Sequence, residues 1–105
     1  MKIKFLASIL VAVLSIGLAR TSCSAAPDAA AGKAVFAANC AVCHGAAGTG
    51  GGAGPNLTTI PSAKNLQRVE TQVTKGGITM PAFKGALTPQ QIEDVSAYVV
   101  KFITH

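Results

Sequence analysis

Two cysteines and a histidine occur within five consecutive residues of this chain, in the pattern Cys40-Ala-Val-Cys43-His44. Cys40 and Cys43 are three positions apart, so on a helix they share one turn, and His44 follows directly. The chain has only one other cysteine, Cys23. Because so few thiols cannot form a disulfide framework, the cluster is expected to hold a metal or a cofactor around which the chain folds.

The first 25 residues are typical of a secretory signal peptide. Lys2 and Lys4 precede an apolar run, Phe5 to Leu18, and small residues follow as far as Ala25,. We predict cleavage near Ala25, which would remove Cys23. The run of about 14 apolar residues is shorter than the roughly 20 that span a bilayer, which disfavours an uncleaved anchor. A lipid anchor on Cys23 is a further alternative.

Residues 26–105 are the predicted mature domain, with six basic side chains against four acidic ones. The domain has no arginine-rich stripe with interleaved aromatic residues, so nucleic acid is not an expected partner,. After cleavage we expect no stable membrane insertion. A domain of about 80 residues is near the lower limit for stability from an apolar core alone, so a cofactor is expected to complete the core.

The sequence predicts an all-α fold with three helices and long loops, and no segment alternates as a strand does,. The first helix is predicted from about Ala29 to Cys43, with Asp28 as its N-cap. The second is predicted over Pro61 to Lys75, with Ser62 as its N-cap. Between them, residues 45–55 contain six of the eleven glycines, a composition that predicts a loop with close backbone approaches,.

The third predicted helix has the clearest signals in the chain. Thr88 is the expected N-cap, Pro89 the first helical residue, and Gln91 completes a capping box,. Tyr98 is expected to flank the buried face. The residues predicted for that face are Ile92, Val95, Val99 and Phe102.

Three kinds of site could use the cysteine and histidine cluster. A structural zinc site needs four ligands, which the mature chain reaches only by adding His105, and Cys43 and His44 would then have to bind the same ion. A thiol-disulfide exchange site is disfavoured because the cluster ends its predicted helix, where the helix dipole opposes a thiolate. Covalent haem attachment fits best, because two thiols on one turn can bond both vinyl groups while His44 is directed at the iron.

Met80 is the candidate for the second axial ligand of that iron, in the segment GGITMPAFKG. A lone methionine is ordinarily core filler, but this one lies in a predicted loop between glycines and Pro81. A soft, neutral thioether favours iron(II) and raises the reduction potential. With both axial positions filled, electron transfer is favoured over catalysis. The terminal His105 is a weaker alternative ligand.

Over roughly residues 28–104 the chain resembles the class I c-type cytochromes. The stretch GKAVFAANCAVCH, residues 32–44, resembles the first helix of that family, and GPNL, residues 54–57, resembles a loop next to the proximal histidine. The stretch MPAFKGALTPQQIEDVSAYV, residues 80–99, is similar to the methionine loop and C-terminal helix of the cytochrome c6 and c553 group. The resemblance implies a small class I cytochrome c fold, with three main helices and long loops around one covalently bound haem c.

The resemblance also implies a role for each site residue. Cys40 and Cys43 would hold the haem covalently, with His44 as proximal ligand and Met80 as distal ligand. The carbonyl of Pro55 would accept a hydrogen bond from His44, fixing the tautomer of the imidazole.

Two further positions match the packing of the family's first and last helices. Gly32 and Phe36 would pack against the C-terminal helix at Tyr98. The glycine-rich loop, by contrast, departs from the longer segment that photosynthetic members usually carry at this place.

The function implied is that of a soluble one-electron carrier rather than an enzyme. It would shuttle electrons between a membrane quinol-oxidising cytochrome complex and a photosystem or terminal oxidase. It would act as a monomer in a bacterial periplasm or a thylakoid lumen, with Lys33, Lys64 or Lys84 near the haem edge. A haem peroxidase or gas-binding protein with a labile sixth ligand is the alternative.

Overall fold

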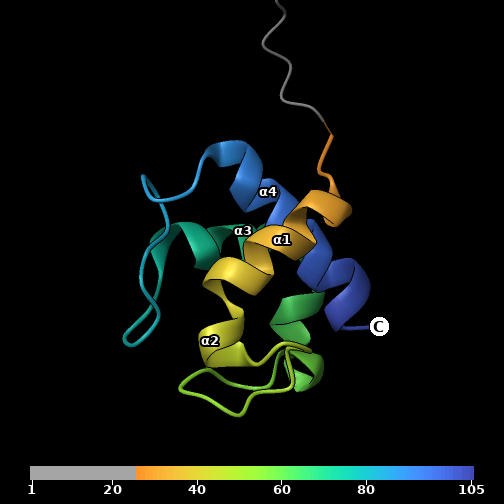
Figure 1. Ribbon diagram of the computed structural model, residues 1–105, viewed down its shortest axis with the longest axis vertical. Coiled ribbons are helices and arrows are strands. Elements are labelled where there is room, and N and C mark those ends of the chain that lie inside the picture. The colour runs from red at the N-terminus through yellow and green to blue at the C-terminus, as the bar shows by residue number, and fades with distance from the viewer. Residues whose placement is uncertain (1–25) are drawn as a thin grey trace, which may run out of the picture.

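The computed structural model describes residues 26–105 (Figure 1). The predicted signal peptide, residues 1–25, and its cleavage site near Ala25 lie outside the described residues. The helical elements are, in chain order, α1 (Ala29–Asn39), α2 (Ala41–His44), η1 (Leu57–Thr59), η2 (Pro61–Lys64), α3 (Leu66–Lys75), α4 (Pro89–Tyr98) and η3 (Val99–Ile103). Residues 26–105 contain no strand, only an isolated bridge between Lys84 and Leu87, which confirms the all-α prediction.

The crossing of α1 and α4 organises the core (Figure 1). Gly32 is buried where the two helices meet, and a Cβ atom at this position would overlap the backbone carbonyl oxygen of Asp94 and lie 2.9 Å from Cβ of Tyr98. Beside this contact the rings of Phe36 and Tyr98 pack with their centroids 5.5 Å apart. The expected packing of Gly32 and Phe36 against the last helix is confirmed.

Asp28 caps α1 as predicted and also joins it to α4. One of its carboxylate oxygens accepts hydrogen bonds from the backbone N–H groups of Ala30 at 2.9 Å and Ala31 at 3.2 Å. Its own N–H donates to Oδ1 of the buried Asp94 at 2.8 Å. The same Oδ1 accepts a bond from the side-chain amide of Gln90 at 2.9 Å, so the carboxylate of Asp94 is satisfied despite its burial.

The first predicted helix is interrupted at Cys40, so the prediction of a continuous helix to Cys43 was wrong. Cys40 has φ −111°, far from the helical value, and α2 follows as a single short turn,. Asn39 is the last residue of α1, and its side-chain amide donates to the carbonyl of Val35 at 3.0 Å. The bend turns Cys40 into the core, where it is 8% exposed.

The second helix begins later than predicted. Pro61 starts a 3₁₀ turn, η2, and Asn65 in extended geometry caps α3 by accepting from the N–H of Arg68 at 3.0 Å. Ser62 is therefore not the N-cap. Val69 and Val73 are buried, whereas Leu66 is 38% exposed, and Gly76 ends α3 with φ +70°.

The start of α4 agrees with the helix predicted from the sequence, but the end of that helix does not. Thr88 Oγ1 accepts from the N–H of Gln91 at 3.1 Å, and Gln91 Oε1 accepts from the N–H of Thr88 at 2.8 Å. After Tyr98 the helix widens into the π-helical segment η3, in which the N–H of Thr104 donates to the carbonyl of Val99 at 3.1 Å,.

Because of this wider turn, the buried face predicted for the last helix is partly wrong. Ile92, Val95 and Val99 are buried, but Phe102 is 54% exposed and Ile103, 7% exposed, takes its place in the core. The α-helical period assumed from the sequence no longer applies beyond Tyr98. None of the helices in residues 26–105 has the length and apolar character needed to cross a membrane.

Ser96 on α4 is buried completely and its hydroxyl has no hydrogen-bond partner in the described structure. Because an unpaired buried hydroxyl costs free energy, Ser96→Ala is expected to raise the free energy of unfolding of the holoprotein by about 1 kcal/mol. Guanidinium denaturation measures this change. Thr49→Val, which removes a hydroxyl from an exposed loop, is the control and should change stability by less than about 0.5 kcal/mol. A destabilised Ser96→Ala protein would contradict the prediction.

Candidate cofactor cavity

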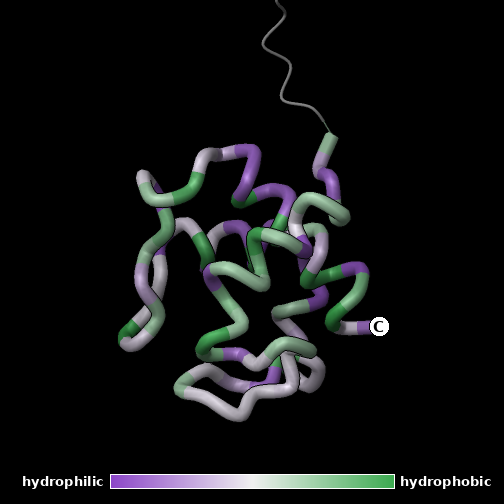
Figure 2. The backbone as a smooth tube through the Cα atoms, in the orientation of Figure 1, coloured by the Kyte–Doolittle hydropathy of each residue, from purple (hydrophilic) through white to green (hydrophobic). Residues whose placement is uncertain are grey.

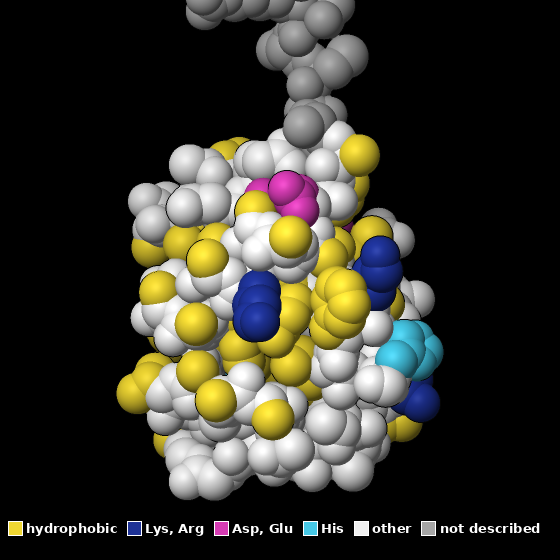
Figure 3. All heavy atoms as spheres, turned by 45° about the vertical axis from the view of Figure 1, so that its right-hand side comes forward, with side chains coloured by type: hydrophobic (Ala, Val, Ile, Leu, Met, Phe, Trp, Pro, Cys, Tyr) yellow, Lys and Arg dark blue, Asp and Glu magenta, His cyan; other side chains and the backbone are white. Residues whose placement is uncertain are grey.

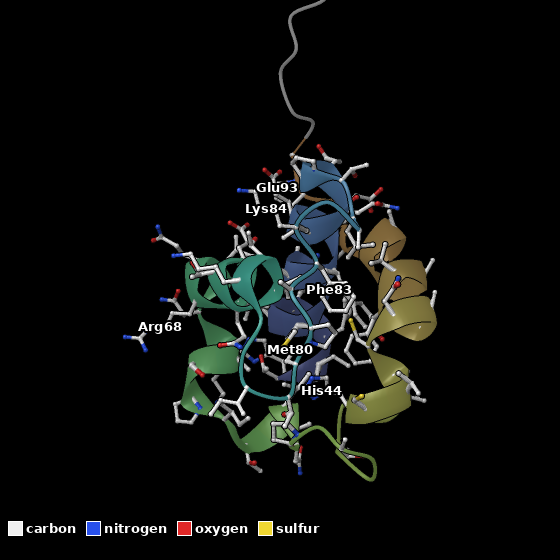
Figure 4. All side chains as sticks on the ribbon, turned by 90° about the vertical axis from the view of Figure 1, so that its left-hand side faces the viewer. His44, Arg68, Met80, Phe83, Lys84 and Glu93 are labelled. Atoms are coloured by element: carbon white, nitrogen blue, oxygen red, sulfur yellow. The ribbon has the colours of Figure 1, made fainter. Side chains whose placement is uncertain are left out.

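A cavity of about 980 Å³ lies between α1, α2, α3, α4 and the loop that joins α3 to α4. The five site residues predicted from the sequence, which come from distant parts of the chain, all line it: Cys40, Cys43, His44, Pro55 and Met80. Much of the remaining wall is apolar and includes Phe36, Val69 and Val95. Figure 4 shows His44 and Met80 facing the same interior space.

His44 ends α2 and is held by the glycine-rich loop. Its Nδ1 lies 2.9 Å from the carbonyl oxygen of Pro55. A carbonyl only accepts, so Nδ1 carries the proton in this contact and Nε2 is left with a free lone pair. Such a contact is the usual way in which proteins fix the orientation of a metal-binding imidazole.

The loop itself reaches this position because of its glycines. The N–H of Gly50 donates to the carbonyl of His44 at 2.7 Å, and the N–H of Gly54 donates to that of Cys43 at 2.9 Å. Gly45, Gly48 and Gly50 have positive φ values of 85°, 72° and 91°. The predicted close backbone approach is confirmed, and in Figure 2 the loop is pale, with near-neutral hydropathy.

Gly54 lies directly against the imidazole, since a Cβ atom there would be 2.8 Å from Nδ1 of His44. Gly54→Ala is therefore expected to push the ring away from Pro55 and to lower the free energy of unfolding of the holoprotein by about 1–3 kcal/mol. Denaturation followed in the cofactor's absorption measures this. Gly77→Ala is the matched control, because its Cβ would meet only the flexible side chain of Gln72 at 3.1 Å. Equal losses in the two variants would contradict the prediction.

Cys40 and Cys43 are free thiols on the cavity wall. Burial raises the pKa of the Cys40 thiol to about 11, and the neighbouring Cys43 adds to this effect. A raised pKa is the opposite of what a thiol-disulfide exchange site needs. For the zinc alternative, residues 26–105 contain no group of three or more His, Cys, Asp or Glu side chains that could hold a metal ion, and His105 does not line the cavity.

Met80 lies across the cavity on the loop between α3 and α4. Its side chain is half-buried, and its Sδ accepts a weak hydrogen bond from Nε2 of Gln72 at 3.9 Å. Backbone bonds hold the loop: Gly77 N–H donates to the carbonyl of Met80, and Phe83 N–H to that of Val73, both at 2.9 Å. The sulfur is thus presented by a loop that has one bond within itself, at Gly77, and one bond back to α3, at Val73.

Sequence reasoning did not identify Gln72 and Arg68 as cavity residues. Gln72 lies three positions after Val69 on α3, a spacing that could have placed it on the cavity side,. Arg68 also lines the cavity, whereas none of the expected lysines, Lys33, Lys64 and Lys84, does so.

The donor set fits a covalently attached iron porphyrin. An imidazole with a free Nε2 and a thioether reach one largely apolar cavity, and two thiols lie on its wall. Imidazole and thioether are the axial pair found in cytochromes c. An all-α chain of this size with such a cavity defines a class I c-type cytochrome.

Comparisons with known proteins agree with this class. Residues 27–99 match a protein-family model described as "Cytochrome C oxidase, cbb3-type, subunit III". Cytochrome c6 of Gloeothece citriformis is 38% identical over 102 residues, covering 93% of both chains. Cytochrome c6 of Limnospira maxima is 46% identical over 81 residues, covering 70% of this chain and 91% of its own.

Among solved structures, cytochrome c6 from the diatom Phaeodactylum tricornutum has a TM-score of 0.62 and 34% identity, covering 72% of this chain and 94% of its own. The chain therefore belongs to the class I c-type cytochrome family and is cytochrome c6-like. Its cofactor is one covalently bound haem c.

Proposed function

We propose that the protein is a soluble one-electron carrier, shuttling electrons between a membrane quinol-oxidising cytochrome complex and a photosystem or terminal oxidase. One observation supports this more than any other. His44 and Met80, 36 positions apart in the chain, line one cavity whose wall also carries both thiols. The relatives named cytochrome c6 come from cyanobacteria and a diatom, which favours the photosystem as the electron acceptor.

Each site residue has one role in this proposal. Cys40 and Cys43 would form the thioether bonds, His44 would bind the iron through Nε2, and Met80 would bind it through Sδ. Pro55 holds the proton of Nδ1 and so keeps the imidazole oriented,. The haem supplies an iron that stores one electron by changing between its two oxidation states.

Electron transfer rather than catalysis is the activity that this pair of ligands would favour. If His44 and Met80 both bind the iron, little rearrangement is needed when an electron arrives and no position is left for oxygen or peroxide. The peroxidase or gas-binding alternative requires a vacant or labile sixth position and has no observation in its favour. We propose that the carrier is a monomer exported to a bacterial periplasm or thylakoid lumen after cleavage near Ala25.

Mass spectrometry of the exported protein under denaturing conditions tests the proposal at its base. From cells competent in cytochrome maturation, we expect a coloured protein that begins near Ala26 and carries the mass of one haem. The haem should stay attached on denaturation, because thioether bonds survive it. A Cys40→Ser/Cys43→Ser double variant is the control and should lose the haem. Colourless protein with the mass of the polypeptide alone would overturn the proposal.

A further inference from the structure

A second groove, of about 790 Å³, lies on the side of the molecule away from the loop that carries Met80 (Figure 1). It is formed by the start of α1, the end of α4 and η3, and shares no residue with the cofactor cavity. Phe102, which the π-helical turn directs outward, and the half-buried Tyr98 form its aromatic part. An aromatic ring exposed in this way is a frequent anchor of protein interfaces.

Three aromatic rings connect this groove to the cofactor cavity. Phe36 lines the cavity and is 2% exposed. Its ring centroid is 5.5 Å from that of Tyr98, which is in turn 5.8 Å from that of Phe102 at the surface. Both separations are those of rings in direct contact. A continuous path of packed side chains therefore runs from the cavity wall to the opposite face.

Basic side chains outnumber acidic ones in the groove, with two lysines against Asp28. Lys33 and Lys101 line it and are exposed, and Nζ of Lys101 lies 5.4 Å from the centroid of the Phe102 ring. The acidic residue of the groove, Asp28, already accepts two hydrogen bonds at the start of α1. The predicted cleavage would add the α-amino group of Ala26, which also lines the groove. Figure 3 shows basic side chains set in a largely apolar surface on this side.

We propose that this groove is a second docking surface, to which an acidic one-electron redox protein binds, and that the rings of Phe36, Tyr98 and Phe102 form the path between that protein and the cofactor. The cationic rim selects an acidic partner by charge complementarity. One electron passes from the reduced partner to the oxidised cofactor or in reverse, and no bond or proton is exchanged. The inference rests on the proposed carrier function, since it adds a second exchange face to the same cofactor.

The two faces differ in character, which gives them different partners. At the cavity, Val42 is 81% exposed and Ile78 is fully exposed, so the cavity face presents aliphatic side chains together with the guanidinium of Arg68. The groove instead offers an aromatic centre between two lysines. A carrier must exchange electrons with a donor and an acceptor, and two unlike faces let it distinguish them.

Nuclear magnetic resonance with hexacyanochromate(III), a paramagnetic trianion, tests the docking surface without an activity assay. In ¹⁵N-labelled reduced holoprotein at low salt, the anion should broaden the amide signals of Lys33, Lys101 and Phe102. A Lys33→Gln/Lys101→Gln double variant should weaken this broadening by about tenfold, because removal of each charge should weaken binding of the anion roughly threefold. The matched control, Lys64→Gln/Lys75→Gln, removes two exposed lysines outside both cavities and should keep the broadening.

Broadening that is confined to other residues, or that persists in the Lys33→Gln/Lys101→Gln variant, would overturn the docking surface. A second copy of this chain as the occupant would give concentration-dependent shifts of the same amides without the anion, and would overturn it as well. Either result would overturn the docking surface while the haem signals remained unchanged. Failure of the docking surface can therefore be distinguished from failure of the carrier function.

Flash photolysis tests the path of rings. A ruthenium tris-bipyridyl photosensitiser on the thiol introduced by Lys101→Cys would reduce the cofactor in a single step. In this background Tyr98→Phe should keep the rate, whereas Tyr98→Leu and Phe102→Leu should slow it several-fold, with unchanged reduction potentials. Equal rates with and without the rings would overturn the path.

Discussion

Gly32→Val is expected to produce the largest loss of stability of any single substitution considered for this protein. The new side chain would overlap the backbone carbonyl oxygen of Asp94, and because this oxygen belongs to α4, no rotamer change can relieve the contact. The helices α1 and α4 must separate, which also parts the rings of Phe36 and Tyr98. We expect a loss of about 3–5 kcal/mol in the free energy of unfolding.

This loss is large compared with the roughly 5–15 kcal/mol that hold a small domain folded. Guanidinium denaturation of the holoprotein, followed by far-ultraviolet circular dichroism, measures it. Ala34→Val introduces the same side chain at an exposed position of α1 and should cost only about 0.5 kcal/mol, the helix propensity difference. Similar losses in both variants would show that the contact between the helices does not depend on Gly32.

Met80→Ala is expected to lower the reduction potential by roughly 0.2 V, a fraction of the ≈ 0.8 V range that axial ligands span. The thioether favours iron(II), so its removal favours iron(III). The open position should then bind added imidazole or cyanide, which the parent protein resists. Potentiometric titration and absorption spectra measure both effects.

Ala82→Ser provides the control for Met80→Ala. Ala82 is on the same loop but is exposed and does not line the cavity, so its substitution should leave the potential and the spectrum unchanged. An unchanged potential in Met80→Ala would remove Met80 from the ligand set and would reopen the choice of sixth ligand.

The parts of the fold that the sequence predicted are those with local causes. Thr88, Pro89 and Gln91 specify the start of α4 within four residues, and the capping box forms as expected. Asp28 likewise caps α1 through bonds to Ala30 and Ala31. These signals need no knowledge of the rest of the molecule, because the donor and acceptor groups are a turn apart.

The errors have causes that lie outside the local sequence. Ser62 and Asn65 are both good capping residues, and the 3₁₀ turn at Pro61 decides between them. The apolar helical period of the sequence predicts that Phe102 is buried, but the helix widens at η3 and Phe102 is exposed. No signal in the sequence predicts that widening. The predicted site residues, by contrast, do line one cavity. Cys40, Cys43, His44 and Met80 could be predicted from the chemistry of their side chains, without knowledge of the fold.

The loop that holds Pro55 against His44 has a consequence for how the protein matures. Glycine loses more conformational freedom on ordering than any other residue, and residues 45–55 contain six of them,. We therefore expect this segment to become ordered only after His44 is held by the cofactor. Until then the thiols of Cys40 and Cys43 would remain accessible for attachment.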